Sequence, residues 1–125
     1  MKFREFETSS GKKVLAGKSA ANNEELVEQI KPDEDVFHTA KPGSPFCNIK
    51  SSRTNTNDRR ETAIFCASKS QDWRDNKSDV EVHHFKGKDI SKKRGMKLGT
   101  FAVKKHNSIF VKKKKIQNLI NKQKK

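Results

Sequence analysis

The amino-acid sequence predicts an α+β fold: a mixed or mostly antiparallel sheet of about six or seven short strands, with two packed helices. Three observations lead to this prediction. Apolar residues come in runs of strand length, turns rich in glycine, proline and serine separate these runs, and two longer segments begin with capping-box patterns. The length of 125 residues fits one domain. We place that domain at 1–111 and treat 112–125 as a lysine-rich C-terminal tail.

The N-terminal third predicts a hairpin followed by a helix. Residues 3–8 and 13–17 are two short runs joined by a serine-glycine turn, which is typical of paired strands. Asn22 is a good helix N-cap, and the helix should end near Lys31 because Pro32 cannot continue it. A lysine beside free N–H groups at this helix start is a natural place for an anion.

A central hairpin is predicted next, with strands on either side of a Lys-Pro-Gly-Ser turn at 41–44. Pro42 sets the φ angle at which such a turn begins, and Gly43 supplies the positive φ that a type II turn requires. His38 precedes this turn, where we expect it to donate a hydrogen bond to a nucleic acid. The backbone of the turn, made basic by Lys41, is suited to phosphate.

The second half of the chain predicts a helix and further strands. Asp58 and Glu61 form a capping-box pair, which indicates a helix from about Arg59 to Trp73. Residues 80–85 alternate in the manner of a strand. A basic, glycine-punctuated loop follows at 86–99, and we expect 100–103 and 108–111 to be two strands joined by a turn.

The tail places Ile116, Leu119 and Ile120 at helical spacing among lysines, which is typical of a basic amphipathic helix or of a frayed arm. Three apolar positions are too few to hold it firmly on a core. We therefore expect the folded domain to end near Val111 and the tail to act as an electrostatic arm.

The charge distribution points to a polyanionic partner. The net charge is +14, and residues 79–125 contribute +12 of it, with fifteen Lys and Arg residues against three acidic ones. Such asymmetry is typical of nucleic-acid-binding proteins, and we favour this interpretation. The plainer interpretation of the same charge is a solvated, self-repelling surface that only aids solubility. Composition alone does not separate RNA from DNA.

Other chemistry lacks a pattern in this sequence. Cys47 and Cys66 match no zinc spacing and are interpreted as small core residues in a reducing compartment. The histidines stand in no metal motif, and neither a Walker loop nor a dinucleotide fingerprint occurs. Asp35 and His38 lie three apart in a strand, so they should face opposite ways. We expect no cofactor, no metal, no catalytic residue, no membrane span and a cytoplasmic location.

Two stretches carry a resemblance to a known family. Asp35-Val36-Phe37-His38 with Pro42-Gly43-Ser44, and the strand-to-helix turn from Gly17 to Leu26, resemble the NFACT-R domain of ribosome quality control factors of the RqcH kind. The resemblance extends over about residues 3–111. The sequence departs from the family pattern at Pro45, where histidine is frequent, and at Leu98, where proline is usual.

The resemblance implies a non-catalytic RNA-binding module for rRNA or tRNA, acting on the large ribosomal subunit in ribosome-associated quality control or translation. Separate proteins would then supply the other NFACT domains. Two alternatives stay open, namely binding of double- or single-stranded DNA and a small nuclease-like enzyme that uses His38. We expect one RNA-binding surface from separated stretches of the chain, formed by Lys18, Asn22, Asn23, His38, Lys41, Gly43, Ser44, Arg53, Lys92, Lys93, Arg94 and Lys97.

Overall fold

The computed structural model describes residues 3–123 and has one main sheet of six strands, in the order β1-β2-β4-β3-β5-β8. Every neighbouring pair in it is antiparallel. The predicted α+β class and the mostly antiparallel sheet are therefore confirmed. The strands are β1 (Arg4–Glu7), β2 (Lys13–Ala16), β3 (Asp35–Thr39), β4 (Cys47–Ile49), β5 (Val80–Lys86) and β8 (Asn107–Val111).

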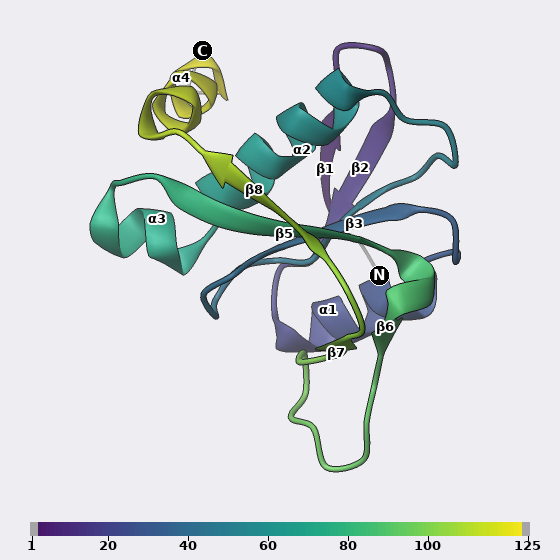
Figure 1. Cartoon of the computed structure of the whole chain (residues 1–125). Helices are drawn as coiled ribbons and strands as arrows, with labels where there is room; N and C mark the ends of the chain where they lie inside the picture. Colours follow the sequence, from purple (N-terminus) through teal and green to yellow (C-terminus); the bar gives the residue numbers. More distant parts are fainter. Residues whose placement is uncertain (1–2, 124–125) are drawn as a thin grey trace.

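A second, two-stranded sheet and four α-helices complete the fold (Figure 1). Two helices had been predicted. The other two arise because the segment predicted as one helix from about Arg59 to Trp73 divides into two, and because the tail forms a helix on the core. The small sheet consists of β6 (Ile90–Ser91) and β7 (Ala102–Val103), and the helices are α1 (Ala20–Glu28), α2 (Thr56–Ser68), α3 (Gln71–Asn76) and α4 (Lys113–Gln123).

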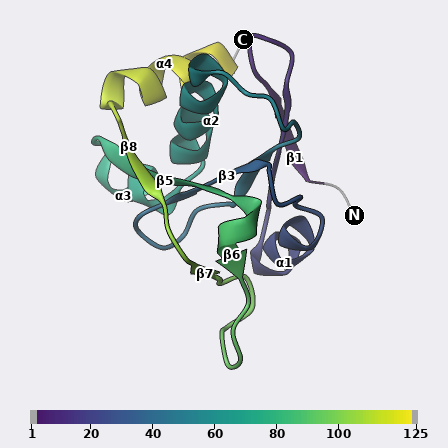
Figure 2. The same cartoon turned by 45° about the vertical axis from the view of Figure 1, so that its right-hand side comes forward.

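Helices cover both faces of the main sheet. Figures 1 and 2 show α2 and α4 on one side, and α1 with β6 and β7 on the other. Alternation along β3 serves both sides: Phe37 belongs to the core cluster beneath α2, whereas Val36 packs with Leu26 of α1. His38, one residue after Phe37, lies on the α1 side, where its ring packs against Phe46. This second face carries the candidate site.

Two helix starts differ from the prediction. The N-cap of α1 is Ser19, whose Oγ accepts a hydrogen bond from the Asn22 N–H at 3.1 Å, so the helix begins earlier than expected. Asn22 was wrongly predicted as the cap because both residues are good caps and the turn after Gly17 decides between them. In α2 the cap is Asn55, and Asp58 completes its capping box.

The helix predicted from about Arg59 to Trp73 is in fact two helices. The chain breaks after α2, and Ser70 then caps α3 by accepting a hydrogen bond from the Trp73 N–H at 3.1 Å. Serine favours such caps because its hydroxyl competes for backbone groups. Trp73 is almost fully buried, so it belongs to the core.

The strands at 100–103 and 108–111 do not form the predicted hairpin. β7 pairs with β6, and β8 pairs with β5 at the edge of the main sheet. Local turn signals around residues 105–107 could not reveal this, because both partners come from the preceding part of the chain. The segment between β6 and β7 projects from the body of the molecule in Figure 2.

The tail is a helix that packs on the core, contrary to the prediction of a weakly held arm. Ile116 of α4 is completely buried, and Leu119 and Ile120 pack against the same cluster. Residues 1–2 of the predicted domain and 124–125 of the predicted tail lie outside the described residues. The proposed role of residues 112–125 as an electrostatic arm stays a prediction.

Both cysteines are buried and carry free thiols, in agreement with their interpretation as core residues. Burial raises the pKa of the Cys47 thiol, and its hydrogen bond with Cys66 raises it further. Among residues 3–123, no helix has the length and apolar character needed to cross a membrane.

Candidate nucleic-acid interface

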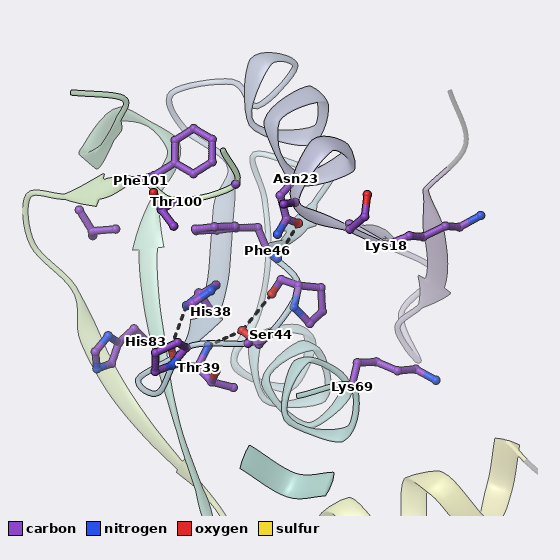
Figure 3. A pocket seen from close by; sticks show the side chains of 18 of the residues that line it. Lys18, Asn23, His38, Thr39, Ser44, Phe46, Lys69, His83, Thr100 and Phe101 are labelled. Carbon is purple, nitrogen blue, oxygen red and sulfur yellow. Dashed lines mark hydrogen bonds between the residues drawn. The ribbon is translucent and has the colours of Figure 1, made fainter. Parts of the chain in front are cut away.

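A cavity of about 660 Å³ opens on the α1 face of the sheet (Figure 3). This volume falls within the range of roughly 300–1,000 Å³ that is usual for ligand pockets. The walls come from the turn before α1, the β3–β4 hairpin, β5 and the end of the β6–β7 loop. Its lining includes Lys18, Asn23, His38, Gly43, Ser44, Phe46, Lys69, His83, Phe101 and His106.

Five rings form much of the wall. The His38 and Phe46 rings lie 4.3 Å apart, and Phe101 meets Phe46 edge-on at 5.3 Å. His83 stacks on His106 with 3.7 Å between ring centroids. His38 and His83 are direct cross-strand partners, so their side chains lie on the same face of the sheet.

The surroundings of His38 favour its neutral imidazole form. Its Nδ1 lies 2.7 Å from the carbonyl oxygen of Thr39, and a carbonyl only accepts, so Nδ1 carries the proton. Burial lowers the pKa of His38, and the nearby His83 lowers it as well. In this tautomer Nε2 is an acceptor. Neutral His38 would thus offer a nucleic acid an acceptor at Nε2 in place of the expected donor, because the backbone takes the Nδ1 proton.

Asn23 joins α1 to the hairpin. Its Oδ1 accepts a hydrogen bond from the Phe46 N–H at 3.2 Å, and it leaves no room for a side chain at Gly17. A Cβ at Gly17 would lie 1.8 Å from that oxygen. Asn22 lies outside the cavity lining; its Oδ1 accepts a hydrogen bond from the Lys18 N–H at 2.8 Å and so braces the turn.

The predicted Pro-Gly turn is present, with Gly43 at φ +92°. Ser44 closes it by accepting a hydrogen bond from the Thr39 N–H at 3.0 Å. Lys41 lies outside the cavity lining, where its Nζ is 3.6 Å from Asp72. Gly43 and Ser44 therefore shape the cavity, whereas Lys41 adds charge beside it.

The charged lining is uniformly basic. Arg4, Lys18 and Lys69 contribute cations, and no carboxylate occurs among the described residues that line the cavity. The Arg4 guanidinium is oriented by a hydrogen bond to the Gly17 carbonyl at 3.2 Å. Anions that enter the cavity would meet attraction without a neighbouring repulsive charge.

The basic loop at 86–99 contributes its C-terminal end to the cavity lining, whereas its lysines lie outside the lining. Leu98, Gly99, Thr100 and Phe101 are part of the lining. Lys92 holds the loop closed: its three ammonium protons match acceptors at Glu24, the Lys97 carbonyl and the Thr100 carbonyl. All four cations of this loop that were predicted to bind RNA are exposed and lie outside the lining: Lys92, Lys93, Arg94 and Lys97.

The structure thus brings together five of the predicted site residues in one cavity, and Arg53 lies apart in the loop before α2. Sequence reasoning did not identify Arg4, Lys69, His83, Phe101 and His106 as cavity residues. His83 carried a usable signal, because its place in a predicted strand puts it on the same face as Phe85. The other four depend on tertiary packing.

The side chain of Asp35 lies on the face of the sheet opposite to His38. It accepts hydrogen bonds from His84 at 2.7 Å, from Lys86 at 2.9 Å and from Thr54. Burial by itself raises the pKa of Asp35, but these hydrogen bonds outweigh it and hold the pKa well below its usual range. His38 therefore has no carboxylate partner in Asp35. No cluster of three potential metal ligands occurs within residues 3–123.

Comparison with solved structures places this fold among known ones. One match is described as the C-terminal part of the fibronectin/fibrinogen-binding protein from Streptococcus suis, with a TM-score of 0.81 and 21% sequence identity. It covers 94% of this chain, and the chain spans 49% of that one. At this identity the likeness shows the fold alone. A search of curated proteins gives no match.

Comparison with protein families gives a match over residues 2–105, which is most of the sequence, to the NFACT protein RNA binding domain. The matched segment contains the turn before α1, the central hairpin, β5 and nearly all of the cavity described above. The chain belongs to the NFACT RNA-binding domain family.

Proposed function

We propose that this chain is a non-catalytic module that binds rRNA or tRNA on the large ribosomal subunit, in cytoplasmic ribosome-associated quality control or translation. The RNA-binding character of the family supports the choice of RNA. Phosphates would meet the rim of the cavity at Arg4, Lys18 and Lys69, and the exposed loop cations would extend this surface.

One observation carries the proposal: the chain has fifteen acidic residues, yet none lies among the described residues of the cavity lining. Where acidic residues occur near the surface cations they are paired elsewhere, as Glu24 is with Lys92 and Asp72 with Lys41. A phosphate at the rim is therefore attracted by several cations at once. Such contacts position a nucleic acid without reading its sequence.

The nuclease-like alternative has less support. An imidazole that acts as a base is usually supported by a carboxylate that stabilises its protonated form, and no Asp or Glu occurs among the described residues of the cavity lining. DNA remains the competing ligand, because phosphates look alike to these cations. A binding measurement therefore needs both nucleic acids.

The test is binding of fluorescently labelled RNA and of DNA of the same sequence, measured by anisotropy over a series of salt concentrations. Each phosphate contact should add about −0.7 for single strands to the slope of log affinity against log salt. Lys18→Gln and Lys69→Gln should each weaken binding and flatten this slope, whereas Arg60→Gln on α2 is the control that removes an exposed charge away from the cavity.

Affinity that does not change with salt, or equal losses in all three variants, would contradict a phosphate-binding rim. Stronger binding of DNA would transfer the proposal to the DNA alternative. The rRNA or tRNA assignment is tested separately by crosslinking in cells and sequencing of the bound RNA. Pull-down in the same cells would identify separate proteins that supply the other NFACT domains.

A further inference from the structure

The cavity offers more than charge, since two of its polar side chains, His38 and Asn23, each keep one hydrogen-bonding group without a partner. Nδ1 of His38 is bonded to Thr39, and Oδ1 of Asn23 is bonded to the Phe46 N–H. Their remaining atoms, His38 Nε2 and Asn23 Nδ2, make no hydrogen bond within the described residues. No fully buried side-chain nitrogen or oxygen there lacks a partner, so neither atom is sealed off completely from the cavity or solvent.

The two groups are complementary. Neutral His38 Nε2 accepts a hydrogen bond, and Asn23 Nδ2 donates one. Both side chains contact Phe46, His38 through its ring and Asn23 through the backbone N–H, and Figure 3 shows them on either side of that residue. A donor and an acceptor on either side of Phe46 are the two kinds of group that the edge of a nucleobase also presents.

The same cavity provides flat and apolar surfaces. The His83–His106 pair ends in an exposed imidazole at His106. Leu98 is 60% exposed, and it is the one exposed large apolar residue among residues 3–123 that lines the cavity, since Phe110 lies elsewhere. Exposed apolar surface at the mouth of a polar-edged pocket is a usual mark of a ligand site.

We propose that the cavity accepts one unpaired nucleobase of a single-stranded RNA segment, which stacks on the His83–His106 imidazoles and presents its edge to His38 Nε2 and Asn23 Nδ2. This inference rests on the proposed function, in which the rim cations hold the flanking phosphates. It adds that the site selects unpaired over paired RNA, because a base within a helix has both its faces and its pairing edge occupied.

The first experiment compares three labelled probes of equal length: a ten-nucleotide oligouridylate or oligoadenylate, a ribose phosphate chain without bases, and an RNA duplex. Both base-bearing single strands should be tested, because the donor–acceptor pair can favour one of them. At least one should bind several-fold more tightly than the chain without bases, and more tightly than the duplex at equal phosphate concentration.

Variants separate the stacking surface from general stability. His106→Ala should weaken binding of the preferred oligonucleotide by roughly fivefold or more, as expected for loss of a stacking partner. Phe110→Ala is the matched control, because this ring is also exposed but lies outside the cavity. Asn23→Asp keeps the oxygen that accepts from Phe46 and removes the donor, so it should weaken base-bearing strands more than the chain without bases.

Equal affinity for oligonucleotides and for the chain without bases would overturn the base site while leaving the phosphate-binding function intact. Equal effects of His106→Ala and Phe110→Ala would overturn it as well. Failure of every RNA probe to bind would instead remove the proposed function, and the base site with it. Chemical-shift changes of the His83 and His106 ring protons on addition of the preferred oligonucleotide would support stacking directly.

Discussion

Replacing Ile116 with alanine should destabilise the whole domain, although this residue lies in a tail dominated by lysine. Its side chain is completely buried in the cluster beneath α2. Truncation of a buried isoleucine to alanine costs about 2–5 kcal/mol, since the lost contacts are not replaced. For a domain of this size each kcal/mol lowers the melting temperature by roughly 3–5 °C, so a decrease on the order of 10 °C is expected.

The assay is thermal unfolding followed by circular dichroism, with Asn118→Ala as control because Asn118 lies on the exposed side of the same helix. RNA affinity of Ile116→Ala, measured well below its melting temperature, should stay close to that of the unchanged protein. If the two variants melt at the same temperature, α4 does not contribute to the core, and an electrostatic arm that hangs free from the domain would describe residues 112–125 better.

Three further predictions concern the loop and the titrating groups. Gly99→Ala should destabilise more than Gly95→Ala: both glycines have positive φ, which costs roughly 1–2 kcal/mol for alanine, but only at Gly99 would the new Cβ lie 2.7 Å from the backbone of Ala20. Equal losses in urea denaturation would contradict this contact. The pKa of Asp35 is lowered, so this carboxylate stabilises the fold fully above the ordinary carboxyl pKa of about 3.9, and the stabilisation is lost as the pH falls through the lowered value. In a series of melting temperatures against pH, Asp35→Asn should therefore be less stable than the unchanged protein at neutral pH. Its stability should also decline less steeply in acid. The lowered pKa of His38 means that the unfolded chain takes up its proton first, so stability should decline as the pH falls below about 6.5, and His38→Gln should remove that part of the decline. An unchanged pH profile in His38→Gln would show that His38 is not buried as a neutral ring.

Local signals explain what the sequence could predict. The central hairpin was correctly located because Pro42 and Gly43 specify a turn on their own, whatever surrounds them. The alternation around His38 likewise indicated that Asp35 faces the other way, and the hydrogen bonds of Asp35 confirm this. The α+β class follows from the same short-range patterns.

Long-range packing explains what the sequence could not predict. The ion pair of Lys92 with Glu24 joins residues 68 positions apart, and no spacing rule indicates such a pair. For this reason the sequence predicted Lys92 to be an RNA-binding cation of the loop. Lys69 reaches the cavity only because α2 ends beside the hairpin. Ile116 illustrates the same limit for the fold, since three apolar residues among lysines do not reveal that they pack against the core cluster beneath α2.

The two faces of strand β3 pack against different parts of the protein, and this determines where the chain tolerates inserted or deleted residues. Val36 and His38 serve the cavity side, and Phe37 serves the core beneath α2. A residue inserted before Phe37 would move its ring to the α1 side and the His38 imidazole to the α2 side, so each would meet packing made for the other. The tip of the β6–β7 loop is different, because a side chain at Gly95 would meet nothing within 4 Å. Insertions and deletions should therefore be excluded from β3 but accepted at this tip, which makes it the natural position for an inserted affinity tag or fluorophore.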